Sequence, residues 1–169
     1  GASAMALRAF TRAADFALAI GSTTLEATAR ASAAAAGHDA GRPAEAMEAG
    51  ARAIALLARL NRPRDEARAR LNYAALLLAM GATREARNEA ATARERALGA
   101  GDRQTSAYAC FVLLDAWLLD GSTDVTAGHA GAGTLADEAE RSLGAEAADG
   151  DRVRVLAYRM LAECEIDSK

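Results

Sequence analysis

The chain has 169 residues, of which 51% are hydrophobic and only 4% aromatic, and its formal net charge is −3. Alanine supplies most of the hydrophobic fraction, and because alanine, leucine, arginine and glutamate are strong helix formers, the composition favours helices over any sizeable sheet. Acids and bases are interspersed without a net basic face, and no apolar run approaches the ~18–20 residues that span a bilayer, so we expect no nucleic-acid contact, no membrane insertion and a cytoplasmic location.

Helix-start signals divide the first half of the chain. Thr23 and Glu26 have the spacing of a capping box, in which a threonine and a glutamate satisfy the first N–H groups of a helix. Pro43 and Pro63 each suit a first helical turn, where the missing N–H costs nothing. The predicted helices of this half cover about 5–20, 24–38, 43–60 and 63–80.

Similar signals continue through the second half. Thr83 and Asp102 can cap helices, because their side-chain oxygens accept hydrogen bonds from the first turn. Thr134 indicates another start, and Asp149 or Asp151 opens the last helix. The predicted helices of this half cover about 84–99, 103–120, 134–147 and 150–165.

A period of 40 residues relates these helices. Gly41, Gly81 and Gly121 follow apolar helical stretches, at the position where a helix commonly ends on glycine. Further positions keep the same interval: Ala6, Ala46 and Ala86; Ala13, Ala53 and Ala93; Ala27, Ala67 and Ala107; Ala31, Leu71 and Phe111; Ala33, Tyr73 and Leu113. A fixed period of this length predicts a solenoid of stacked helix pairs.

The glycine-rich segment 121–133 breaks this register. Beyond it, a shift of about 50 residues restores the match, as in Ala86 with Ala136, Ala107 with Ala157 and Phe111 with Leu161. We interpret 121–133 as a flexible insertion of about ten residues in one turn.

The segment 71–81 and the helix after it resemble a tetratricopeptide repeat. The resemblance rests on the small and large residues Ala74, Leu77, Gly81, Ala86 and Ala93, and it covers nearly the whole chain. It implies an all-α, right-handed superhelix of antiparallel helix pairs, with about eight helices here, and close packing at Ala74 and Ala86. The period of 40 exceeds the usual 34, the proline that usually closes the second helix is absent, and Leu114 replaces the small residue of the third repeat.

Longer repeats of this kind resemble those of bacterial transcriptional regulators, signalling ATPases and kinesin light chains. The resemblance implies a protein- or peptide-binding regulatory or scaffold module of a larger bacterial protein. The alternative is a ligand-sensing domain that binds a small molecule or signalling peptide in its groove. In such arrays the first helix of each pair lines a concave groove, which here implies a partner site formed by Arg68, Leu71, Tyr108, Phe111, Asp115, Tyr158 and Glu165. Several of these residues could instead pack between helices.

The sequence offers little for catalysis. His38 and His129 lie far apart and belong to no metal-binding motif, and Cys110 and Cys164 form no C-x-x-C pair. We therefore expect no catalytic residues, no metal, no cofactor and no enzyme activity. We predict a single domain over 1–169, a piece of a longer array, because its first helix looks like the second half of a repeat and its last like the first half of another. The oligomeric state stays open.

Overall fold

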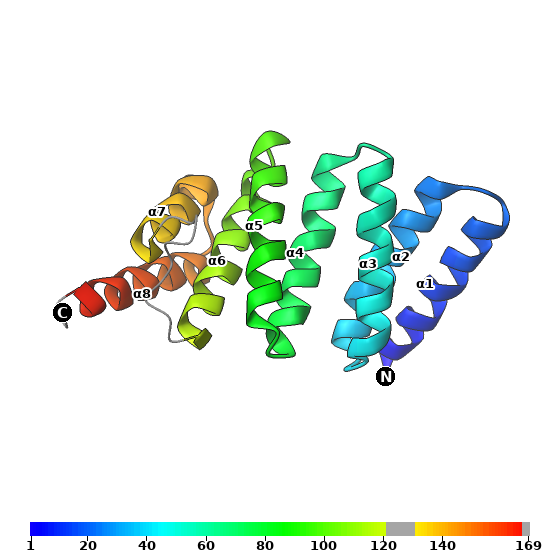
Figure 1. Cartoon of the computed structure of the whole chain (residues 1–169), viewed down its shortest axis with the longest axis horizontal. Coiled ribbons are helices and arrows are strands. Elements are labelled where there is room, and N and C mark those ends of the chain that lie inside the picture. Colours follow the sequence, from blue (N-terminus) through cyan, green and yellow to red (C-terminus); the bar gives the residue numbers. More distant parts are fainter. Residues whose placement is uncertain (121–130, 167–169) are drawn as a thin grey trace.

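The computed structural model describes residues 1–120 and 131–166, without the side chains of Glu146 and of 163–166. The described residues form eight α-helices and one 3₁₀ turn and contain no strand, and successive helices pack against each other in a row (Figure 1). The helices are α1 (Ala2–Ala19), α2 (Thr23–Asp39), α3 (Pro43–Arg59), α4 (Pro63–Ala79), α5 (Thr83–Gly99), α6 (Arg103–Asp120), α7 (Ala132–Leu143) and α8 (Asp149–Ile166). The expectation of an all-α solenoid of about eight helices is confirmed.

The turns between the first six helices are alike. At each of them one residue has a positive φ, between 52° and 77°, and these residues recur every 20 positions: Gly21, Gly41, Asn61, Gly81 and Gly101. In the turn at Asn61, its N–H donates to the carbonyl of Ala58 and the next N–H, of Arg62, donates to Leu57, both at 3.1 Å. This is the Schellman motif, and the other four turns repeat it. Asparagine occupies the left-handed conformation more readily than most residues, so Asn61 continues the series without a glycine. The unit of the array is therefore one helix and one turn, and the period of 40 spans two units.

The caps follow the predictions in part. Pro43 and Pro63 are the first residues of α3 and α4, as expected. Asp102 caps α6, because its carboxylate accepts hydrogen bonds from the N–H of Thr105 at 3.2 Å and from the Thr105 hydroxyl at 2.9 Å.

Two predicted caps are wrong. Ser22 is the N-cap residue of α2, and the Glu26 carboxylate accepts from Arg52 Nε at 2.9 Å instead of capping the helix. Helix α5 begins at Thr83 itself, whose hydroxyl donates to the Gly81 carbonyl instead of capping the first turn. In both helices the preceding turn already orients the chain, so each begins at the threonine without a side-chain cap.

The array curves because its two sets of helices pack differently. We call α2, α4, α6 and α8 the first helices and α1, α3, α5 and α7 the second helices. Helix α2 contacts α4 and α4 contacts α6, whereas within the described residues α3 and α5 make no comparable contact. Since the first helices lie closer together, the array is concave on their side.

Small residues let the helices approach closely. Ala74 and Ala86 are fully buried, as their register predicted. A Cβ added to Gly37 would lie only 3.0 Å from the Cβ of Ala46, so α2 and α3 meet where neither has a larger side chain. Leu114 is also fully buried and α6 still packs on α7, so the third pair accommodates the larger residue.

The predicted register fails in the last helix. Ala136 is fully buried in α7, as expected, but in α8 Ala157 is exposed and Leu161 is 43% exposed. A 3₁₀ turn over Gly144–Glu146 replaces the three-residue turn used earlier, and α7 has 12 residues where α5 has 17. Helix α8 therefore lies steeply across the end of the array (Figure 1) and buries Val155 and Tyr158 instead. The match of Ala13 to Ala53 is also wrong, since Ala13 is exposed on the terminal helix.

The predicted insertion over 121–133 lies mostly outside the described residues. Its last two residues, Ala132 and Gly133, belong to the first turn of α7, so the predicted segment extends too far. Gly121, the third glycine of the predicted series, also lies outside the described residues.

Candidate functional site

A groove of about 690 Å³ lies on the concave side of the array, between three first helices. We call it the central groove. Its lining residues are Leu71, Asn72, Ala75, Leu78 and Ala79 of α4, Tyr108, Val112, Asp115, Leu118 and Leu119 of α6, and Arg154 of α8. Helices α4 and α6 present these side chains because residues three and four apart share one helix face.

The structure brings together some of the predicted site residues. Leu71, Tyr108 and Asp115 line the central groove together. Phe111 and Tyr158, expected to be partly accessible, are only 1% and 5% exposed, so that expectation is wrong. The tilt of α8 is the reason, because it lays Tyr158 on Phe111 and closes that end of the groove.

The other two predicted residues contribute nothing to the described lining. Arg68 is not among the lining residues, and its Nε donates to Asp102 Oδ2 at 3.0 Å from a half-exposed position. The side chain of Glu165 lies outside the described part of the chain.

A cluster of Phe111, Asp115, Arg154 and Tyr158 closes the α8 end of the groove. The Arg154 guanidinium lies 4.6 Å from the centroid of the Phe111 ring, and the Phe111 and Tyr158 rings stack with centroids 6.1 Å apart. Arg154 and the Tyr158 hydroxyl both donate hydrogen bonds to the Asp115 carboxylate. These contacts fix the carboxylate in one position at the groove wall.

The protonation of this cluster follows from its burial and its partners. Burial, together with the hydrogen bond to Asp115, raises the pKa of Tyr158 to about 12, so the hydroxyl stays a neutral donor at physiological pH. Burial would lower the pKa of Arg154, but its interactions with Tyr158 and Asp115 outweigh that effect and raise it. The cluster therefore holds one compensated ion pair and brings almost no net charge to the groove.

Two lining residues escaped sequence reasoning. Asn72 is exposed on α4, and its amide can both donate and accept hydrogen bonds. It lies one position after Leu71, so a strict helical face drawn through Leu71 left it out. Arg154 could not be found, because the register predicted for α8 is wrong.

The hollow surface continues beyond the central groove. A smaller depression of about 170 Å³ between α2 and α4 is also lined by Asn72 and Ala75, and it reaches His38 and Asp39. Asn72 therefore lies between the two depressions, near the middle of a surface that runs from α2 to α8. Such a surface can bind and orient an extended partner.

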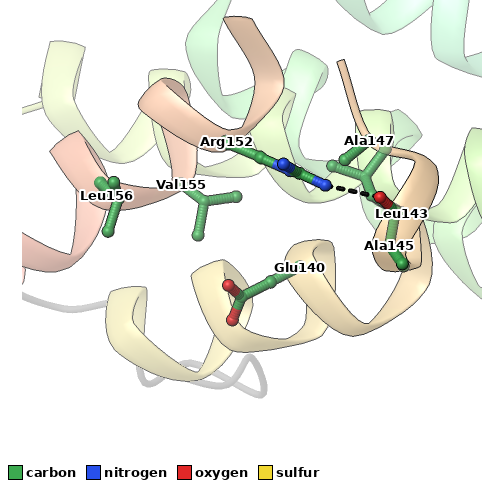
Figure 2. Close-up of a pocket in the computed structure, with 8 residues that line it drawn as sticks. Glu140, Leu143, Ala145, Ala147, Arg152, Val155 and Leu156 are labelled. Carbon is green, nitrogen blue, oxygen red and sulfur yellow. Dashed lines mark hydrogen bonds between the residues drawn. The ribbon is translucent and has the colours of Figure 1, made fainter. Parts of the chain in front are cut away.

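A second cavity, of about 490 Å³, lies between α7 and α8 (Figure 2). Its charged residues already hold these two helices together. Arg152 reaches from α8 and donates to the carbonyl of Ala145 at 2.5 Å, and Glu140 accepts from Arg159 at 2.6 Å. We therefore take the central groove as the candidate site.

Asp102, which pairs with Arg68, should make stability depend on acid. Its burial would raise the pKa, but the hydrogen bonds from Thr105 and the charge of Arg68 hold the pKa below its ordinary value. Because the folded-state pKa is depressed, this carboxylate stabilises the fold above the unfolded-state value, about 4, and the contribution is lost as pH falls through the folded-state value.

We expect Asp102→Ala to cost about 1–2 kcal/mol of unfolding free energy at pH 7, as for other lost N-caps. Asp102→Asn keeps a capping oxygen but cannot titrate. Urea titrations at several pH values should show the difference between wild type and Asp102→Asn shrinking as pH falls below about 4. A difference independent of pH would contradict the ion pair with Arg68.

Neither a metal site nor a relative identifies the chain. In the parts that the structure covers, no three His, Cys, Asp or Glu side chains are grouped so as to hold a metal ion. None of the described helices is both long and apolar enough to cross a membrane. Neither the family models nor the curated proteins compared with the chain gave a match.

Proposed function

We propose that the chain is a tetratricopeptide-like module that binds a protein or peptide segment in the central groove. The observation that carries this proposal is an apolar floor between three helices, with polar groups held at fixed positions around it. Leu71, Leu78, Val112 and Leu118 supply apolar area, and Tyr108 and Asn72 supply hydrogen-bonding groups. Apolar area with a few oriented polar groups is typical of sites that bind peptide segments.

The shape of the surface favours an extended or helical segment. The groove lies open between α4, α6 and α8, and the depression at His38 continues it toward α2. A single small molecule would leave much of this surface uncovered. The volume of about 690 Å³ is nevertheless within the range of small-molecule sites, so a ligand-sensing role is the second candidate.

The charge around the groove indicates the kind of segment. Asp115 is compensated by Arg154, and Tyr108 donates its hydroxyl hydrogen to Asp151 at 3.2 Å. With these charges paired, an ionic partner would gain little, whereas apolar side chains would gain from leaving water. We therefore propose an amphipathic segment with apolar anchors, whose main chain is contacted by Asn72.

The setting of the module is a proposal by analogy of fold and period. We place it in a larger cytoplasmic protein of bacteria, a transcriptional regulator or a signalling ATPase, as the part that senses or holds a partner without catalysis of its own. The groove would then couple partner binding to a neighbouring domain.

Selection of peptides tests the proposal directly. Random peptides displayed on phage would be selected on the immobilised 169-residue chain, and the enriched peptides would be measured by fluorescence anisotropy. We expect Leu78→Glu, on the groove floor, to weaken their binding by at least about tenfold, because a charge replaces an apolar contact. Asn72→Ala, an exposed position, should also weaken it if the amide contacts the peptide.

The matched control is Leu98→Glu, which places the same charge at a half-exposed leucine on α5, away from the groove. It should leave peptide binding unchanged, and circular dichroism should show the same helical signal for all variants. Failure to enrich any peptide, or peptides that bind Leu78→Glu as tightly as the wild type, would contradict the proposed site.

A further inference from the structure

Helix α1 has a second apolar face that no other part of the described structure covers. Its inner face buries Leu7, Ala14 and Ala17 against α2, its one substantial neighbour. On another side runs what we call the outer stripe, formed by Ala2, Met5, Ala9, Ala13, Phe16 and Ile20. Met5, Phe16 and Ile20 are 64%, 67% and 56% exposed. These six residues recur at intervals of three and four, so they form one continuous surface along the helix.

This surface lies at the end of the array opposite to the central groove (Figure 1). Large exposed apolar side chains aligned on one face mark an interaction surface, whereas scattered ones need no explanation. The arrangement on α1 is therefore that of a helix designed to pack on two sides.

The outer stripe is complementary to itself in the antiparallel direction. A two-fold axis near residue 11 places Ala9 opposite Ala13 of a second copy, and Ala2 opposite Ile20. The same axis sets Met5 beside Phe16. The small alanines at the centre let two helices approach closely, while the large side chains at both ends fill the space where the helices diverge.

The charges beside the stripe obey the same symmetry. Arg8 and Asp15 are seven residues apart on one flank of α1, and both are exposed. In the antiparallel pair the flank of one copy faces the same flank of the other, so Arg8 lies opposite Asp15 twice. Asp15 also lies 3.3 Å from Arg30 of its own chain, but its side chain is 63% exposed and can accept a second arginine.

We propose that two copies of this chain form a two-fold symmetric dimer through the outer stripes of their α1 helices. A closed dimer of this type buries the stripe of both copies with one set of contacts. It leaves both central grooves accessible at the far ends. The dimer would thus present two binding sites at a fixed separation, which raises the avidity for a partner with two matching segments.

Sedimentation equilibrium of the 169-residue chain tests the dimer, from about 5 to about 500 µM. We expect the mass to rise with concentration from 17.4 kDa toward twice that value. Phe16→Glu should raise the dissociation constant by at least about tenfold, because a charge then enters the apolar contact. The control is Leu18→Glu, at a leucine that is 51% exposed but lies off the stripe, and it should leave the constant unchanged.

A charge exchange tests the antiparallel register. Arg8→Asp should weaken the dimer by setting two carboxylates opposite each other, and Arg8→Asp with Asp15→Arg should restore it. A chain that stays monomeric at about 500 µM would overturn the proposal and leave the stripe to a different partner. Indifference to Phe16→Glu would likewise overturn it, as would failure of the double exchange to restore binding while circular dichroism shows an intact fold.

Discussion

Replacing Phe111 by alanine should cost about 3–5 kcal/mol of unfolding free energy, the range for removing a buried phenylalanine. The ring is only 1% exposed and packs between Tyr108 and Tyr158, with the Arg154 guanidinium over its face. Deleting it opens a cavity at the point where α6 supports α8. It also removes the surface that holds Arg154 near Asp115, so the end of the groove should loosen.

Urea unfolding followed by circular dichroism measures the loss, and hydrogen exchange locates it. Because each unit of a solenoid contacts only its neighbours, exchange should accelerate in α6–α8 and change little in α1–α3. The control is Leu119→Ala on the same helix, 66% exposed, which should cost under about 0.5 kcal/mol. A loss under about 1 kcal/mol for Phe111→Ala would mean that the ring lies on the groove surface, as its sequence position first suggested.

The sequence predicts the helices and turns well because each is specified locally. Prolines at the starts of α3 and α4 and left-handed residues at the ends of successive helices set the boundaries within a few residues. The interval of 40 then fixes which small residues meet, and Ala74 and Ala86 are buried as expected. The finer interval of 20 was missed because Asn61 interrupts the glycine series.

The groove was only partly predictable, because its α8 end depends on how the last helix packs. Leu71, Tyr108 and Asp115 were placed correctly by the repeat register of α4 and α6. No local signal specifies the tilt of α8, which follows from the 3₁₀ turn at Gly144–Glu146 and from the short α7. The burial of Tyr158 and the contribution of Arg154 are consequences of that tilt.

One repeated feature could have been found from the sequence. Glu26 and Glu66 are 40 residues apart, and each is followed four residues later by an arginine, Arg30 or Arg70. In the structure both glutamates are buried, with only 3% exposure, and each accepts a charge-assisted hydrogen bond from an arginine. Glutamate at an otherwise small or apolar helix position is the signal, and the period confirms that it recurs.

The second large effect is expected from removing one of these carboxylates. Glu66 accepts from Arg70 Nε at 2.8 Å and lies 3.8 Å from Arg96 Nε, so it joins the start of α4 to α5. Burial would lower the pKa of Arg70, but its hydrogen bonds to Glu66 and Glu89 raise it, so the guanidinium stays charged. Glu66→Ala leaves that buried charge with Glu89 alone.

We expect Glu66→Ala to cost about 3 kcal/mol, the lower end for breaking a buried ion pair, because Arg70 keeps Glu89 at 2.7 Å. Urea unfolding measures it, and about 1 M salt should reduce the loss little, since buried pairs are weakly screened. Glu85→Ala, at an exposed glutamate on α5, is the control and should stay within about 0.5 kcal/mol.

The third repeat supplies the variant that identifies the cause. At the positions 40 residues beyond Glu66 and Arg70 lie Ser106 and Cys110, both fully buried and uncharged, so the fold accepts this site without an ion pair. Transplanting that pair, as Glu66→Ser with Arg70→Cys, removes the orphaned charge together with its partner and should cost less than Glu66→Ala alone. If the double variant is the less stable of the two, the loss comes from the packing of the glutamate stem rather than from an uncompensated arginine, and the ion-pair account fails.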